Sequence, residues 1–196
     1  MRKKLLVPMM ALVMTLSLVA CGGEQNSAAA DSEITASSSD SNIEQSIDLV
    51  ENTGNGLSLK MPADIKYAKT DDNLGSMIFT NSENTAVITL GVLIKDSVTS
   101  SDITDDILLA ALSGGGGLSD GRLERSQTIE HDDGTSIVGF GKGTLSSGTA
   151  VNSVIQYFIP KDGSGYYAIS YLYVADAGSS LDDTIEQIVS SVKIVK

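Results

Sequence analysis

The sequence predicts a single α+β domain in which an antiparallel β-sheet is sandwiched with helices. Three observations support this fold class. Short runs of alternating apolar and polar residues are separated by turn-forming residues, which is typical of antiparallel strands. Two other segments repeat their apolar residues at helical spacing. These patterns occupy residues 43–196, a length suited to one domain, and no internal repeat divides them.

The domain begins with two predicted pairs of strands. Residues 47–51 and 57–61 alternate in polarity, and the Asn- and Gly-rich residues 52–56 between them predict a hairpin. Pro62 ends the second run, because proline has no amide hydrogen for a central strand. Residues 76–80 and 85–95 flank the polar residues 81–84, so we expect a second pair there.

The first helix is predicted around residues 101–112. Ser101 is the candidate N-cap, and three aspartates near this end suit the positive end of the helix dipole. The glycine run at 114–117 ends the segment. The apolar residues that recur at helical spacing are Ile103, Ile107, Leu108, Ala111 and Leu112.

Four further strands are predicted to form a meander at residues 122–130, 135–145, 149–159 and 166–174. Their connections at 131–134, 146–148 and 160–165 consist of turn-forming residues. Because connections this short join strands that run in opposite directions, the meander should be antiparallel.

The last predicted element is a helix with one apolar face. Ser180 and Asp183 resemble a capping box at its start. An apolar stripe follows at helical spacing, made of Leu181, Ile185, Ile188, Val189 and Val192. Burying five such side chains contributes about 7–15 kcal/mol before opposing costs. We therefore expect this helix to pack on the sheet.

This order of elements resembles the PsbP-like fold, which also occurs in bacterial lipoproteins. The resemblance rests on GLSLKMP at residues 56–62 and on IVSSVKI at residues 188–194. It implies a scaffold or adaptor role, since such proteins include photosystem accessory subunits and small-GTPase binders. The aromatic residue usual after the proline is absent, and Ile65 stands near its place. No functional residue of the family matches a motif in this chain.

Residues 1–20 predict a lipoprotein signal peptide. Three basic residues precede an uncharged apolar run at 5–20. A helix that spans a bilayer needs about 20 apolar residues, so this run is too short for a membrane span. The run ends at Leu18-Val19-Ala20-Cys21, which resembles the lipobox of bacterial lipoproteins. The resemblance implies a diacylglyceryl group on Cys21 that anchors the chain on the extracytoplasmic face of the cell membrane. The alternative is an ordinary secretory peptide with an incidental cysteine.

Residues 21–42 are interpreted as the lipidated cysteine and a flexible tether rich in Ser, Ala and Gly. Ile34 is the one large apolar residue after Cys21 in this stretch, so it cannot bury enough surface to fold. A tether of this length has a root-mean-square span of roughly 25 Å. The CGG leader and Ser/Ala-rich spacer resemble those of Gram-positive surface lipoproteins, with a Gram-negative periplasm as the alternative location.

The charge balance is acidic, which narrows the expected partners. The chain has 13 Lys and Arg against 25 Asp and Glu, for a net charge of −12, and loss of the three basic residues at 2–4 makes the mature chain more negative. Such a surface repels nucleic acid and anionic lipid headgroups, so membrane contact should come from the acyl chains on Cys21. A single cysteine excludes an internal disulfide and a cysteine zinc site. We expect neither a cofactor nor a metal.

A non-catalytic binding or accessory domain is the favoured function. A Ser-His-Asp arrangement would have to use His131, the single histidine, which lies in a polar turn. The alternative is a small cell-envelope hydrolase that uses acidic residues, and a pocket with converging carboxylates would favour it. Paired acids occur at 71–72, 105–106, 132–133 and 182–183. None of these pairs has the spacing of an EF-hand calcium site, and turns and helix starts explain them.

The predicted binding patch lies on the last strand of the meander. Strand alternation places Tyr167, Tyr171 and Tyr173 on one face, with the small residues Ala168 and Ser170 on the other. Because small residues let a helix approach closely, we expect the terminal helix on their side. At least two of the three tyrosines should then be exposed as a contact patch for an envelope protein or a glycan.

Overall fold

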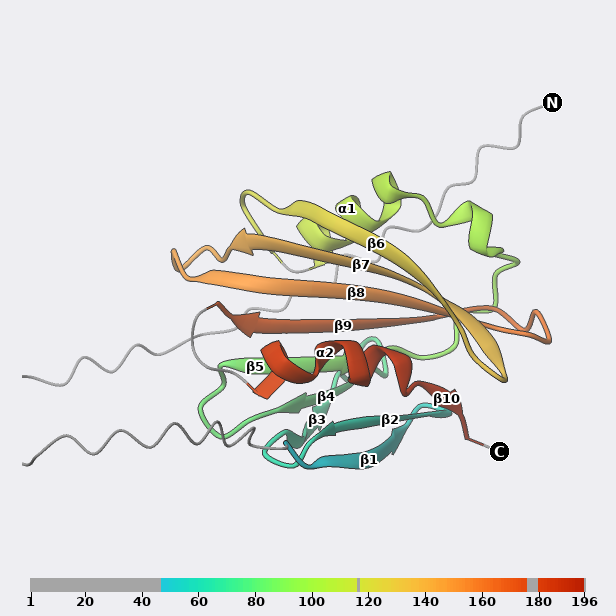
Figure 1. Cartoon of the computed structure of the whole chain (residues 1–196), viewed down its shortest axis with the longest axis horizontal. Helices are drawn as coiled ribbons and strands as arrows, with labels where there is room; N and C mark the ends of the chain where they lie inside the picture. The colour runs from blue at the N-terminus through green and yellow to red at the C-terminus, as the bar shows by residue number, and fades with distance from the viewer. Residues whose placement is uncertain (1–46, 116, 176–179, 196) are drawn as a thin grey trace, which may run out of the picture.

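The computed structural model describes residues 47–115, 117–175 and 180–195, which form two antiparallel sheets and two α-helices (Figure 1). The smaller sheet has the order β1-β2-β10, and the larger sheet has the order β3-β4-β5-β9-β8-β7-β6. None of the described helices has the length and apolar character needed to cross a membrane. The predicted α+β class with an antiparallel sheet and helices is confirmed.

The predicted opening hairpin is confirmed, with a tighter turn than the sequence pattern indicated. Strand β1 (Leu49–Gly54) pairs with β2 (Leu57–Pro62) so that Gly54 lies opposite Leu57. Only Asn55 and Gly56 remain as the loop, with φ angles of 53° and 87°. Two consecutive positive φ values define the type I′ turn, which Asn-Gly adopts readily. The first strand therefore extends through residues that we expected in the turn.

One edge strand of the larger sheet was not predicted from the sequence. Strand β3 (Lys66–Thr70) pairs with β4 (Met77–Thr80), and β4 pairs with β5 (Ala86–Leu90). All five residues of β3 are exposed, so no buried face gives the segment the alternation that marks a strand. The predicted strand at 85–95 is shorter than expected, because after Leu90 only Ile94 forms a further bridge, with Tyr166.

The first helix begins later than predicted. A short 3₁₀ helix, η1 (Ser100–Asp102), precedes α1 (Asp105–Gly115). The predicted N-cap at Ser101 is wrong, because Ser101 lies inside η1, whose N-cap is Thr99, and α1 begins only at Asp105. The α-helix contacts β6, β7 and β8, on which it buries Leu108 and Leu112.

The predicted four-strand meander is confirmed, with ends within one residue of the expected ones. It consists of β6 (Arg122–Glu130), β7 (Gly134–Thr144), β8 (Ala150–Pro160) and β9 (Tyr167–Val174), paired antiparallel in that order.

The terminal helix, α2 (Ser180–Ser190), lies on the opposite face of the larger sheet from α1 (Figure 1). All five apolar residues of the predicted stripe are at most 6% exposed, and four of them lie in α2, whereas Val192 follows the end of the helix. The proposed capping pair of Ser180 and Asp183 lies outside the described side chains. After α2, strand β10 (Lys193–Ile194) pairs with β2. The main core therefore lies between the larger sheet on one side and α2 with the smaller sheet on the other.

Candidate functional site

The predicted tyrosine patch is wrong. Tyr167 and Tyr173 are each 6% exposed and Tyr171 is 0% exposed. All three belong to the core that includes the apolar stripe of α2. The tyrosine with a large exposed area is Tyr67, half exposed on the edge strand β3. Strand β9 therefore offers no aromatic contact surface.

The error concerns which face of β9 the terminal helix covers. We expected the helix over Ala168 and Ser170, whereas it covers the tyrosine face. The space between the larger sheet and the layer of α2 and the smaller sheet needs large side chains to fill it to protein density. The polar end of Tyr171 does not need water, because its hydroxyl donates to Gln156 Oε1 at 2.7 Å inside the core. Burial raises the pKa of Tyr171.

Four polar residues from β7, β8, β9 and the β6–β7 turn form a connected chain in this core. The register brings them together, because Ser136 of β7 and Gln156 of β8 are on the same face as the β9 tyrosines. Gln156 Nε2 donates to Ser136 Oγ and to the Val189 carbonyl oxygen of α2, each at 2.8 Å. Ser136 Oγ lies 2.9 Å from His131 Nε2. We call His131, Ser136, Gln156 and Tyr171 the polar chain.

The contact of Ser136 with His131 has the distance of a nucleophile and its base. Its surroundings oppose that role, because Ser136 is 0% exposed and its oxygen already accepts from Gln156. The ring of His131 packs edge-on against Phe158, with ring centroids 5.4 Å apart. In this conformation the hydroxyl faces the core and a substrate cannot reach it. The pair therefore holds the β6–β7 turn against the sheet.

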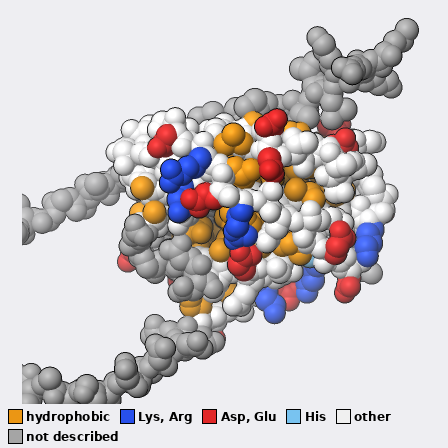
Figure 2. Space-filling model, turned by 45° about the horizontal axis from the view of Figure 1, so that its top comes forward, with side chains coloured by type: hydrophobic (Ala, Val, Ile, Leu, Met, Phe, Trp, Pro, Cys, Tyr) orange, Lys and Arg blue, Asp and Glu red, His pale blue; other side chains and the backbone are white. Residues whose placement is uncertain are grey.

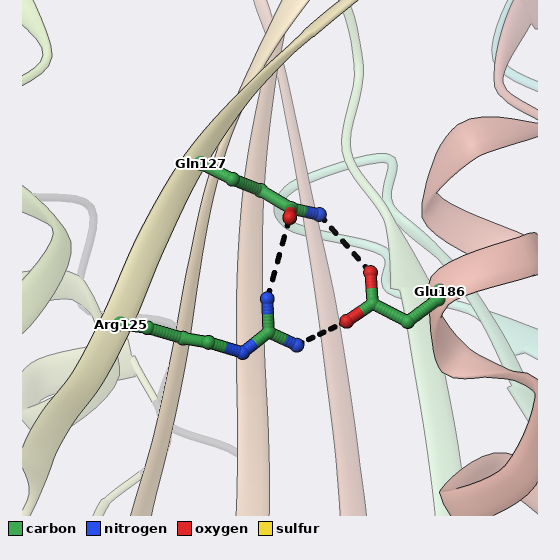
Figure 3. A network of polar contacts seen from close by, with 3 residues as sticks. All are labelled: Arg125, Gln127 and Glu186. Atoms are coloured by element: carbon green, nitrogen blue, oxygen red, sulfur yellow. Dashed lines mark hydrogen bonds and ion pairs between the residues drawn. The ribbon is translucent and has the colours of Figure 1, made fainter.

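A second polar contact joins the far edge of the sheet to α2 (Figure 3). Arg125 of β6 forms an ion pair with Glu186 of α2, and Gln127 donates to the same carboxylate at 3.1 Å. A register shift between Leu123 and Arg125 changes the alternation of β6, which turns Arg125 toward the α2 face. Its guanidinium then lies 3.5 Å from the centre of the Phe140 ring, a cation–π contact.

The charged side chains on the face drawn in Figure 2 are interspersed, with Lys and Arg next to Asp and Glu. The Arg125–Glu186 pair and the Lys142–Glu124 pair, with nitrogen and oxygen 3.0 Å apart in the second, are both close to half exposed. Solvent-exposed pairs of this kind contribute about 0–1 kcal/mol each. This arrangement favours solubility more than binding of a strongly charged ligand.

An open groove of about 480 Å³ lies between the smaller sheet and the end of α2. Ser191 lines the groove and joins its two sides, since its hydroxyl accepts a hydrogen bond from the Lys60 amide at 2.8 Å and donates to the Ile188 carbonyl at 2.7 Å. One lining residue, Asp48, carries a carboxylate, so this groove lacks the pair that an acid hydrolase uses. The lining residues are Ile47, Asp48, Leu49, Lys60, Gln187, Ser190 and Ser191.

In the first two of the predicted acid pairs, one aspartate has a hydrogen-bond partner. Asp71 Oδ1 accepts the amides of Asn73 and Leu74, each at 2.9 Å, and so forms a turn. Asp105 accepts the Ser126 hydroxyl at 2.7 Å, which joins α1 to β6. Across the described ranges 47–115, 117–175 and 180–195, no three His, Cys, Asp or Glu residues lie close enough to hold a metal ion.

Sequence reasoning missed Gln156, which is the centre of the polar chain. A signal was present, because Val154, Gln156 and Phe158 alternate onto one face of a strand that is otherwise apolar there. A long amide on a core face needs internal hydrogen-bond partners. Its partners come from β7, β9 and α2, and the sequence did not reveal how these elements face one another. The predicted lipidation site, Cys21, lies outside the described residues.

Comparison with known proteins gives structural matches alone. No protein-family model matches the chain, and no curated protein is similar in sequence. The crystal structure of the Saccharomyces cerevisiae Ran-binding protein Mog1p is similar with a TM-score of 0.55 and 11% identity, over 77% of this chain and 97% of that one. The solution structure of cyanobacterial PsbP (CyanoP) from Synechocystis is similar with a TM-score of 0.54 and 9% identity, over 81% of this chain and 98% of that one. The chain thus has the Mog1/PsbP-like fold, as its sequence resemblance implied.

Proposed function

We propose that this protein is a lipid-anchored domain on the extracytoplasmic face of the cell membrane, where it has a non-catalytic binding or accessory role. The observation that carries the proposal is the sequence Leu18-Val19-Ala20-Cys21 behind an uncharged apolar run. Two acyl chains on Cys21 give stable membrane anchoring, whereas one chain binds only marginally. Residues 22–42, rich in Ser, Ala and Gly, then separate the folded domain from the bilayer.

The binding role is supported by the fold and by the polar groups described above. Yeast Mog1p, which shares this fold, is a Ran-binding protein, so the fold is compatible with binding another macromolecule. The serine beside the single histidine is fully buried, and the open groove contains one carboxylate. We propose an envelope protein or a glycan as the partner, because the acidic charge of the chain disfavours nucleic acid.

The anchor is tested by replacing Cys21 with serine. In a bacterial host that is fed a fatty-acid probe, the wild-type chain should become labelled and enter the membrane fraction. Cys21→Ser should lose the label entirely, because serine has no sulfur to accept the diacylglyceryl group, and processing at that site should stop. Ser27→Ala, six residues further on, is the matched control and should label normally. Equal labelling of wild type and Cys21→Ser would contradict the anchor.

The tether is tested by limited proteolysis of the full chain. A protease of broad specificity should cut first between residues 22 and 42, because a segment with one large apolar residue cannot bury its backbone. Mass spectrometry should then find a resistant fragment that begins near Ile43 and contains the whole of both sheets. First cleavage inside residues 101–112 would show that the domain boundary is misplaced.

A further inference from the structure

The polar chain connects the single histidine to the C-terminal segment. Gln156 donates to the Val189 carbonyl near the end of α2, and Ser136 joins Gln156 to His131. The same β6–β7 turn makes a second contact with this segment, because Asp133 Oδ2 accepts the amide of Ile194 in β10. The turn therefore contacts the α2–β10 segment (residues 180–194) directly through Asp133, and His131 is joined to it indirectly through Ser136 and Gln156.

Hydrogen-bond chemistry fixes the direction of every bond in the polar chain. The Val189 carbonyl can only accept, so the Gln156 nitrogen must face it, and the Gln156 oxygen is left to accept from Tyr171. The second amide hydrogen of Gln156 is given to Ser136 Oγ. Within the part of the chain that the structure describes, the neighbour that can accept the Ser136 hydroxyl hydrogen is His131 Nε2. His131 is therefore neutral here, with its proton on Nδ1.

Protonation of His131 disrupts this arrangement of hydrogen-bond donors and acceptors. A charged imidazole carries hydrogen on Nε2, so that nitrogen becomes a donor toward Ser136. Ser136 Oγ would then receive hydrogens from both His131 and Gln156, while its own hydroxyl hydrogen loses its acceptor. Because Ser136 is 0% exposed, water does not replace that acceptor. A flip of the Gln156 amide restores an acceptor, because Oε1 then faces the Ser136 hydroxyl, but the same flip turns that oxygen toward the Val189 carbonyl and breaks the bond to α2.

We propose that the β6–β7 turn is an acid-sensitive switch, in which protonation of His131 reverses its hydrogen bond with Ser136 and releases the α2–β10 segment from the larger sheet. The groove between the smaller sheet and α2 would change with it, because Gln187, Ser190 and Ser191 of that groove belong to this segment. An extracytoplasmic location exposes such a switch directly to the pH of the surroundings.

The surroundings of the imidazole lower the pKa of His131. Burial lowers the pKa of His131 below its ordinary value, and the carboxylates of Asp133, Glu130 and Asp132 partly oppose that shift. Lys161, on the β8–β9 connection, donates to the Asp132 carbonyl at 2.9 Å and is exposed. The contacts from α2 and β10 are the uncharged Val189 carbonyl and Ile194 amide. The net effect favours the neutral ring.

The sign of the pH dependence follows from this lowered pKa. In the released or unfolded chain, His131 binds a proton near its ordinary pKa of about 6.5. The stabilising effect of the closed contact is therefore complete above that pH. This stabilising effect is lost as the pH falls from about 6.5 through the lower pKa that His131 has in the closed form. Each unit between the two pKa values changes the opening equilibrium about tenfold.

Nuclear magnetic resonance of the full chain tests the proposal directly, because there is one imidazole to observe. At pH 8 the ring should show the tautomer with hydrogen on Nδ1. Between pH 7.5 and pH 5, amide hydrogen exchange in residues 184–194, corrected for intrinsic rates, should accelerate about tenfold or more. The amides of β4 and β5 serve as the internal reference and should change less.

Two variants separate this switch from general acid sensitivity. In His131→Gln the side-chain oxygen can still accept from Ser136 but cannot titrate, so the acceleration in residues 184–194 should disappear. In Asp133→Asn the amide oxygen can still accept from Ile194, and loss of the negative charge should lower the pKa of His131 further. The proposal is overturned if the ring carries hydrogen on Nε2, if His131→Gln retains the acceleration, or if all strands accelerate equally.

Discussion

Replacing Gln156 with leucine should lower the free energy of unfolding by about 3–9 kcal/mol. The two side chains have similar volume, so the effect comes from lost hydrogen bonds more than from a cavity. Tyr171, Ser136 and the Val189 carbonyl would each lose a partner in the core. A buried group left without a partner costs about 1–3 kcal/mol. Urea unfolding followed by tyrosine fluorescence measures the change, since the chain has no tryptophan.

The chain offers a matched control for this substitution. Gln127 also joins a strand of the larger sheet to α2, through Glu186, but that contact is exposed to solvent. Gln127→Leu should therefore cost less than about 1 kcal/mol, as exposed polar contacts do. Equal effects of Gln127→Leu and Gln156→Leu would show that the polar chain does not stabilise the core more than a surface contact.

A second substitution tests the connection between Gln156 and Tyr171 in the polar chain. Alone, Tyr171→Phe should destabilise the protein, because Gln156 Oε1 loses its donor. In the Gln156→Leu background the same change should be neutral or stabilising, because it removes a hydroxyl that no longer has a partner. Additive effects would mean that the two side chains do not act together.

Much of the fold could be predicted because its signals are local. The four-strand meander has long alternating runs bounded by turn-forming residues, and each predicted end is within one residue of the observed one. The stripe from Leu181 to Val189 in α2 likewise follows from helical spacing alone. The fully exposed strand β3 could not be found in this way, because a strand without a buried face has no alternation to detect.

The candidate site could not be predicted, because it depends on which elements face one another. Strand alternation placed Tyr167, Tyr171 and Tyr173 together on one face, as the structure has them. Alternation does not say which face the terminal helix covers, and the helix covers that one. The contact of His131 with Ser136 is also local, only five residues apart, yet its role depends on Gln156 from the next strand and on Val189 from α2.

Replacing Gly165 with alanine should lower the stability by about 3–5 kcal/mol. Gly165 has a φ angle of +142°, which L-residues rarely adopt, and a methyl group there would lie 2.0 Å from the Ile94 carbonyl oxygen. That oxygen accepts the Tyr166 amide at 2.9 Å, and the Ile94 amide donates back to Tyr166 at 2.8 Å. Both bonds must break for the methyl group to fit. Backbone strain of about 1–3 kcal/mol adds to two lost bonds of about 1 kcal/mol each.

Gly163 supplies the control that separates the clash from the backbone preference. It lies in the same connection with a φ angle of +68°, and a methyl group there would meet no atom within 4 Å. Gly163→Ala should therefore cost only the left-handed conformation, about 1–2 kcal/mol. Hydrogen exchange should show that Gly165→Ala specifically exposes the amides of Ile94 and Tyr166, because that bridge attaches the segment after β5 to the beginning of β9. If the two alanine variants have the same stability, the bridge contributes nothing and the chain that leads from β5 to α1 is held by its other contacts.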